Sequence, residues 1–143
     1  MRNNLRTITF GIGRKVKKGW GHELQIVNHH PEMASNPRED FPLGYSGKLL
    51  VYEKAGAVSS MHFHTVKDET FYVAQGKFRL QYFDPKTADM LTKELNPNDV
   101  VSIPPTNPHQ LICLEAGYIV EFASTDHEWD NFRVAKGDSQ KKS

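Results

Sequence analysis

The sequence has 143 residues, a formal net charge of +1 and one cysteine, Cys113. This length predicts a single domain over residues 1–143 with room for a real core. The near-neutral charge gives no general reason to expect a nucleic-acid partner, and a single cysteine leaves no internal disulfide framework. No apolar run is long enough to span a bilayer, and the N-terminus has no apolar signal segment. We therefore expect a cytoplasmic protein that binds neither nucleic acid nor membrane.

The first third of the chain predicts short strands and one long loop. Residues 5–10 alternate in polarity and predict an edge strand, and residues 23–27 predict a second strand. Residues 29–47 carry three prolines and many polar side chains. A loop of that length in a compact domain is often a binding loop or lid.

From residue 48 onward, strand signals follow one another closely. Expected strands cover residues 48–54, 60–64, 69–74, 77–82, 91–94, 100–103, 110–114 and 118–124. Glycine and proline turn signals separate them, and no amphipathic helix intervenes, so the pattern indicates an antiparallel sandwich or barrel. The apolar members of the central strands, Phe71, Val73, Phe78, Leu80 and Tyr82, are expected in the core. The polar end of the chain, from about residue 136, is expected to be a flexible tail.

Residues 56–76 contain the most informative pattern, G-x5-H-x-H-x4-E-x6-G. His62 and His64 point to the same side of a strand, because side chains alternate faces with a period of two. Glu69 returns to that face from the next strand if residues 65–68 turn the chain. Imidazole and carboxylate ligands without a thiolate suit Zn, Mn, Fe, Co or Ni. We therefore expect one divalent transition metal ion, in a catalytic rather than a structural site.

This stretch matches the first sequence motif of the cupins at every fixed position, and residues 99–109 resemble the second. The resemblance implies an all-β, antiparallel jelly-roll β-barrel and makes His109 the fourth metal ligand. Two positions depart from the family pattern. Thr106 stands where a turn glycine is usual, and Cys113 stands where an asparagine is common. Neither departure removes a ligand.

Two outer segments resemble cupin-type mannose-6-phosphate isomerases and related sugar isomerases: residues 18–23, around Trp20, and residues 119–133. The resemblance implies a small carbohydrate substrate and aldose–ketose isomerisation through a metal-stabilised enediolate. On the last core strand, Glu121 is the first candidate for the base, since burial would raise its pKa toward a useful range. Arg133 is the candidate for holding the substrate. A simpler interpretation also stays open for each outer residue: Trp20 would be an apolar core residue, and Arg133 would form an ion pair at the surface.

Two other functions stay open. A non-haem metal dioxygenase uses the same ligands with iron and would have an apolar, aromatic-lined cavity. A non-catalytic, metal-containing sugar-binding module would use Glu121 only to bind hydroxyl groups. The resemblance also implies a homodimer, in which the expected edge strand at residues 5–10 pairs or exchanges across a two-fold axis.

Overall fold

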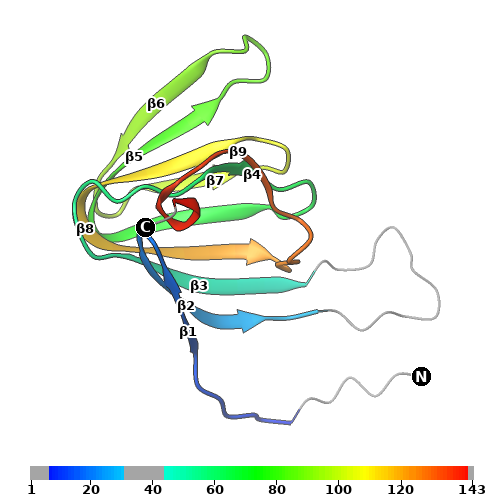
Figure 1. Cartoon of the computed structure of the whole chain (residues 1–143). Helices are drawn as coiled ribbons and strands as arrows, with labels where there is room; N and C mark the ends of the chain where they lie inside the picture. The colour runs from blue at the N-terminus through cyan, green and yellow to red at the C-terminus, as the bar shows by residue number, and fades with distance from the viewer. Residues whose placement is uncertain (1–6, 31–43, 142–143) are drawn as a thin grey trace, which may run out of the picture.

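The computed structural model of the chain describes residues 7–30 and 44–141. Within them lie nine strands, every pair antiparallel, and one short 3-10 helix. The elements are β1 (Arg14–Lys18), β2 (Gly21–Asn28), β3 (Tyr45–Tyr52), β4 (Met61–Phe63), β5 (Glu69–Phe83), β6 (Met90–Leu95), β7 (Val100–Ile103), β8 (His109–Ser124), β9 (Phe132–Ala135) and η1 (Asp138–Gln140). Figure 1 shows them curled into a half-open barrel. The expected all-β, antiparallel jelly-roll class is confirmed.

One continuous path of neighbouring strands runs β1-β2-β3-β8-β4-β9, and β5 joins it by pairing with β8, β6 and β7. The β5–β6 hairpin stands away from the rest of the sheet (Figure 1). No helix in the described part of the chain is long and apolar enough to cross a membrane.

Alternation along the strands decides which side chains enter the barrel. On β3 the inward residues are Ser46, Lys48, Leu50 and Tyr52, and their neighbours on the outer face are more accessible. The core contains the five residues expected there, with Phe71, Val73, Phe78 and Leu80 buried and Tyr82 packed against them. Polar and charged residues also face inward, and they are the beginning of the site described below.

The two longest strands correct the sequence-based boundaries. Residues 69–74 and 77–82 form the single strand β5, and residues 110–114 and 118–124 both belong to β8. The expected turns at Gly76 and Gly117 are bends inside a shared ladder, where the register shifts. Gly76 has a φ of +86°, and a Cβ on Gly117 would lie 2.0 Å from the Gln75 carbonyl oxygen. Both strands therefore bend together, since neither backbone leaves room for a side chain there.

The ends of the chain differ more from expectation. Of the strand expected at residues 5–10, positions 5 and 6 lie outside the described residues, and 7–10 form no strand. The basic run Arg14–Lys18 instead forms β1, which pairs with β2. Most of the loop expected at 29–47 (residues 31–43) lies outside the described residues, but its last part begins β3. Residues 132–135 form β9, and 137–140 pack on the body rather than forming a free tail.

The turn before His109 places Thr106 in the left-handed region of backbone conformation. Its φ is +69°, a conformation that is unfavourable for a β-branched side chain. The turn is nevertheless held, since the Thr106 amide donates to the His64 carbonyl at 2.5 Å. The departure from the family glycine therefore carries local strain and leaves the turn intact.

We predict that Thr106→Gly raises the free energy of unfolding by about 0.5–1 kcal/mol, because relief of the strain exceeds the extra entropy of an unfolded glycine. Urea unfolding measures the change. Thr106→Ala, which keeps a Cβ in the strained conformation, is the control. A glycine variant less stable than the alanine variant would contradict this account of the turn.

Candidate metal centre and cavity

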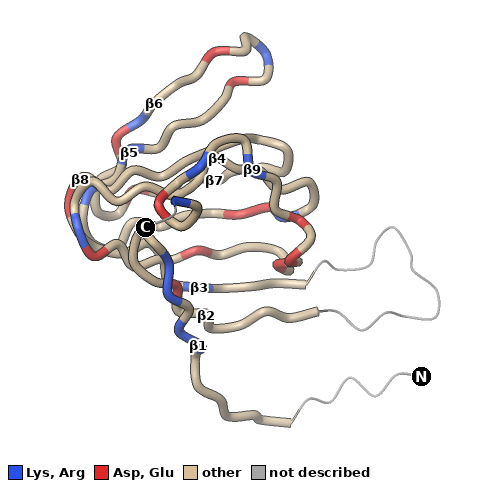
Figure 2. Tube along the Cα trace, viewed as in Figure 1, with Lys and Arg blue, Asp and Glu red and all other residues tan. Residues whose placement is uncertain are grey.

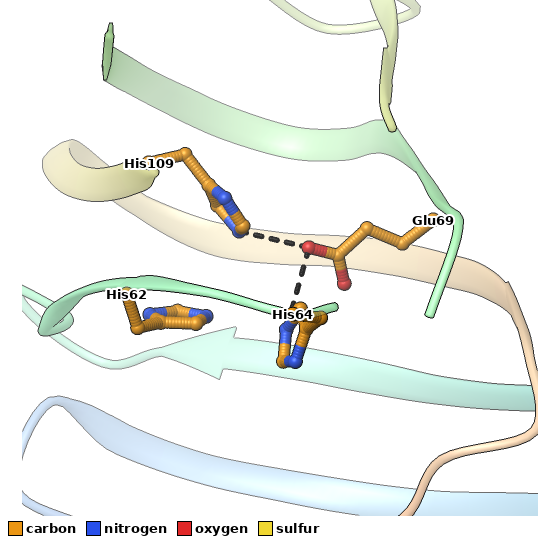
Figure 3. Close-up of side chains that lie close together, drawn as sticks. All are labelled: His62, His64, Glu69 and His109. Carbon is orange, nitrogen blue, oxygen red and sulfur yellow. Dashed lines mark ion pairs between the residues drawn. The ribbon is translucent and has the colours of Figure 1, made fainter. Parts of the chain in front are cut away.

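The structure brings the four predicted ligands together at one point inside the barrel. The ligand atoms of His62, His64, Glu69 and His109 all lie within 4.8 Å of one another (Figure 3). His62 lies on β4, and His64 follows one residue after its end. Glu69 is the first residue of β5, and His109 is the first residue of β8. Residues 65–68 form the connection between β4 and β5 that the spacing required.

This convergence depends on the curl of the sheet. In the β5–β8 ladder Glu69 pairs with Ala123, whereas His109 pairs with Tyr82 at the other end. In a flat sheet, thirteen residues of strand would separate those two pairs by about 40 Å. The Glu69 Oε1 and His109 Nε2 atoms are nevertheless 2.8 Å apart. The bends at Gly76 and Gly117 therefore help to bring the ligands together.

Each histidine is held in the tautomer that a metal needs. The Nδ1 atoms of His62, His64 and His109 lie 2.9, 2.5 and 2.9 Å from the backbone carbonyl oxygens of Ser60, Asp130 and Asn107. A carbonyl oxygen only accepts, so Nδ1 carries the proton and donates it. The Nε2 atom of each ring is left with a lone pair available to a metal.

The unpaired atoms at the centre fit a cation. Glu69 Oε1 and His109 Nε2 are buried, and neither makes a hydrogen bond. His64 Nε2 lies 3.7 Å from the same carboxylate oxygen, as the dashed lines in Figure 3 show. Lone pairs that face one another without a proton or cation between them are costly in a buried site. A divalent ion bound by these four side chains would satisfy them.

The charges around the cluster lead to the same conclusion. Two buried ammonium groups, Lys48 and Lys67, each lie within 4.0 Å of three carboxylates, and together they contact four. Those four are Glu23, Glu69, Glu121 and Asp126. Lys18 Nζ also lies 3.7 Å from Glu23, so with every group ionised the network carries one excess negative charge, which a cation at the cluster would offset. Figure 2 shows acidic and basic positions on several neighbouring strands of the barrel.

The surroundings set the protonation states of the ligands. Burial, reinforced by the neighbouring His109, lowers the pKa of His62 to about 3, and burial also lowers the pKa of His64. Burial would raise the pKa of Glu69, but the Lys67 ammonium beside it favours the charged form, and that pKa is held well below its usual range. The two histidines are therefore neutral and the carboxylate ionised at neutral pH, which are the metal-binding forms.

Glu121 lies on β8 and faces the same interior, with 4% of its surface exposed. Burial raises its pKa to about 7, although Lys67 and Lys48 act in the opposite direction. Its Oε2 atom lies 3.6 Å from Lys67 Nζ and makes no hydrogen bond. Two neighbouring carboxylates, Glu69 and Glu121, are thus held in different protonation states.

A cavity of about 370 Å³ opens over the cluster. Its polar wall includes Glu121, Lys48, Lys67 and Asp126, and Arg133 reaches it from β9. Arg133 is exposed and pairs in register with His62. Apolar residues line the same cavity, namely Trp20, Leu50, Tyr52, Phe71 and Leu111, and Phe71 pairs in register with Glu121. Trp20 is buried and stacks on Tyr52 with ring centroids 4.4 Å apart, so it is part of the core as well as of the wall.

Sequence reasoning missed three residues that support the site. Lys67 stands at an unspecified position of the motif, between His64 and Glu69. The only signal for Lys48 is the alternation of β3, which places its side chain inside the barrel. Asp130 is 1% exposed, and its carboxylate accepts from Thr65, Val66 and Lys67 amides at 2.6, 3.0 and 2.9 Å. It therefore holds the β4–β5 connection while its carbonyl holds His64. No local pattern marks such a contact across 65 residues.

Comparison with known proteins agrees with this geometry. A family model described as "Cupin domain" matches residues 49–126, more than half of the chain. Among curated proteins, none matches.

Solved structures resemble the chain at low sequence identity. Oxalate decarboxylase from Bacillus subtilis matches with a TM-score of 0.70 and 18% identity, covering 93% of this chain and 33% of the other. Another structure of that enzyme, from work on its Mn(II) centers, has a TM-score of 0.69 and 17% identity over 93% and 34%. The capsular polysaccharide assembling protein CapF from Staphylococcus aureus has a TM-score of 0.69 and 14% identity over 88% and 32%. The chain spans about a third of each, and the likeness establishes the fold.

We predict that His62→Ala abolishes tight metal binding, since three ligands would remain around a partly collapsed site. Elemental analysis measures the metal, and thermal unfolding gives an independent reading. Metal at a hundred times its dissociation constant should stabilise the wild type by about 2.7 kcal/mol and the variant far less. His22→Ala is the control, because His22 contacts Glu53 outside the cluster. Equal metal content in wild type and His62→Ala would contradict the assignment.

We also predict a pH signature for Glu121 in the metal-free protein. Its folded pKa of about 7 lies above the unfolded value of 4.5, so the folded state binds the extra proton. That contribution to stability is complete below about pH 4.5 and is lost as pH rises to about 7. Glu121→Gln removes it, so the variant should gain up to about 3 kcal/mol relative to wild type between pH 5 and 8. Urea unfolding with a chelator measures this difference, and parallel pH curves would contradict it.

Proposed function

The chain belongs to the cupin family, and on that premise we propose that it is a metal-dependent enzyme that moves a proton on a small hydroxylated carbonyl compound. The specific reaction we propose is aldose–ketose isomerisation of a sugar. The observation that carries the proposal is Glu121, a buried carboxyl with a pKa near 7 that lines the same cavity as the His/Glu cluster. A group with that pKa accepts and returns a proton at neutral pH.

His62, His64, Glu69 and His109 would hold the metal. A bound divalent ion there supplies Lewis-acid polarisation of a carbonyl and stabilises negative charge on its oxygen. The residues of the chain provide the metal ligands and the acid–base group. Glu69 stays ionised because the Lys67 ammonium favours its charged form, whereas burial keeps Glu121 able to take up a proton. Two carboxyl groups with separated pKa values are the usual arrangement for one ligand and one acid–base residue.

Lys67 and Lys48 orient the Glu121 carboxylate. Lys67 Nζ lies 3.6 Å and Lys48 Nζ 3.8 Å from Glu121 Oε2, and both lysines are themselves buried. Their charges favour the ionised carboxylate, so they keep the pKa of Glu121 from rising further. The base is thereby held in place beside the metal ligands before a substrate enters.

The walls of the cavity suit a sugar-sized molecule. A volume of about 370 Å³ lies at the small end of the range of about 300–1,000 Å³ that small-molecule sites occupy. Lys48, Asp126 and Arg133 offer donors and acceptors for hydroxyl groups. Trp20, Tyr52 and Phe71 offer apolar surface in the same cavity, which can cover the C–H face of a ring.

The similar structures suggest which metal and which substrates to test first. Oxalate decarboxylase from Bacillus subtilis has Mn(II) centers, so manganese is the first metal to try. CapF is a capsular polysaccharide assembling protein, which keeps carbohydrates among the candidate substrates.

A metal dioxygenase is the second candidate, and the aromatic wall is the observation that favours it. Trp20, Tyr52 and Phe71 form the kind of apolar surface expected of a site for an aromatic substrate. The charged residues that line the same cavity favour the isomerase.

The test loads the protein with Mn, Zn, Fe, Co or Ni in turn and incubates it with aldoses, ketoses and their phosphates in D₂O. We predict deuterium incorporation at the carbon next to the carbonyl, followed by interconversion of one sugar pair, both measured by NMR. Glu121→Gln should lower kcat by about 10²–10⁴-fold with unchanged metal content. Glu53→Gln, a carboxylate on the outside of the barrel, should leave kcat unchanged.

The other outcomes separate the alternatives. Oxygen consumption by the iron-loaded protein with an aromatic substrate would replace the isomerase with the dioxygenase. Sugar binding without deuterium exchange for any metal would leave a binding module, and full activity in Glu121→Gln would remove Glu121 from the reaction.

A further inference from the structure

The last described segment of the chain, Lys136–Lys141, lies beside the metal site but outside the matched family region of residues 49–126. In Figure 1 its short helix η1 lies next to the turn between β1 and β2. Ser139 and Gln140 line the same cavity as the metal ligands. The end of the chain is therefore part of the cavity wall.

Two contacts hold this segment on opposite sides. Towards the β1–β2 turn, the Gly19 amide donates to Ser139 Oγ at 3.0 Å. Towards the segment between β3 and β4, Asp138 makes a reciprocal pair of hydrogen bonds with Val58. The Val58 amide donates to Asp138 Oδ2 at 2.9 Å, and the Asp138 amide donates to the Val58 carbonyl at 2.9 Å.

Glycine makes the fit possible. A Cβ on Gly137 would lie 2.2 Å from the Ser59 carbonyl carbon and 2.3 Å from the Ser60 amide nitrogen. Gly137 is buried, and its amide donates to Gln140 Oε1 at 3.0 Å. The segment thus presses its backbone directly against the peptide between Ser59 and Ser60.

That peptide leads directly to a metal ligand. The Ser60 carbonyl accepts from His62 Nδ1 at 2.9 Å, the contact that fixes the His62 tautomer. On its other side β8 holds the same stretch, since the Ser59 amide donates to Leu111 O at 3.0 Å and Ser59 Oγ accepts from the Leu111 amide at 2.9 Å. The stretch from Val58 to Ser60 is therefore held between β8 and the end of the chain.

We infer that Asp138 is a positioning residue for the metal site: through Val58–Ser60 it fixes the Ser60 carbonyl and thereby the ring of His62. It plays for His62 the role that Asp130 plays for His64, although the two contacts differ, since Asp130 also supplies the carbonyl itself. The last segment of the chain is a functional part of the site. This inference concerns metal binding and holds whichever reaction the site performs.

The experiment compares metal affinity, by competition with a chelator, and the His62 Nδ1 proton, by ¹⁵N-resolved imidazole NMR of the metal-free protein. Asp138→Ala should weaken metal binding by at least about tenfold, the effect expected when a residue that orients a metal ligand is lost. It should also broaden or remove the His62 Nδ1–H signal. Asp138→Asn, which keeps an oxygen acceptor for the Val58 amide, should restore both. Gly137→Ala, which forces the segment away, should reproduce the loss.

Lys141→Ala is the matched control, because it breaks only the exposed ion pair of Asp138 Oδ1 with Lys141 Nζ. It should leave metal affinity and the NMR signal unchanged. Wild-type affinity and an intact His62 Nδ1–H signal in both Asp138→Ala and Gly137→Ala would overturn the inference. A wild-type protein that binds no metal would refute the proposed function, whereas the NMR comparison would still decide whether Asp138 positions His62.

Discussion

Three imidazole lone pairs and one carboxylate meet inside the barrel, and much of the structure serves to hold them there. Burying such groups without a partner is costly, so each must be oriented by a contact on its far side. Three backbone carbonyls meet this need by accepting the Nδ1 protons of His62, His64 and His109. The central atoms remain unpaired in the protein alone, and this is the physical basis for a divalent ion at that point.

The same constraint explains why charged residues extend along one wall of the cavity. The buried carboxylate of Glu69 is paired with the ammonium group of Lys67. That ammonium group is also paired with Glu121 and Asp126, so burying one carboxylate brings further charged residues into the cavity. Glu121 is buried and its Oε2 atom makes no hydrogen bond, so burial outweighs the charges of Lys67 and Lys48 and its pKa rises to about 7. The proposed base is thus a product of the network that supports the metal ligands.

Support for the ligands comes largely from residues near the end of the chain. Asp130 holds the β4–β5 connection, and Asp138 holds the stretch before β4. Both lie outside the matched family region. The matched core supplies the four ligands, while this additional segment closes one side of the cavity and restrains two of the histidines. A segment of this kind can vary between members of a fold family without change to the ligands, and it is a natural place for differences in metal affinity or substrate to arise.

The sequence by itself was sufficient for three of the ligands and for an antiparallel β fold, because both depend on local periodicity. His109 and the jelly roll were predicted from the resemblance to the cupin motifs. His62 and His64 share a face through two-residue alternation, Glu69 follows a short connection, and regular turn signals between apolar strands predict an antiparallel barrel. Only the tertiary structure decided that Gly76 and Gly117 bend two long strands instead of ending four short ones. It also decided that Lys67, Asp130 and Asp138 support the site, and that residues 137–140 pack on the body. These features depend on contacts between residues far apart in the chain, which the order of neighbouring residues does not encode.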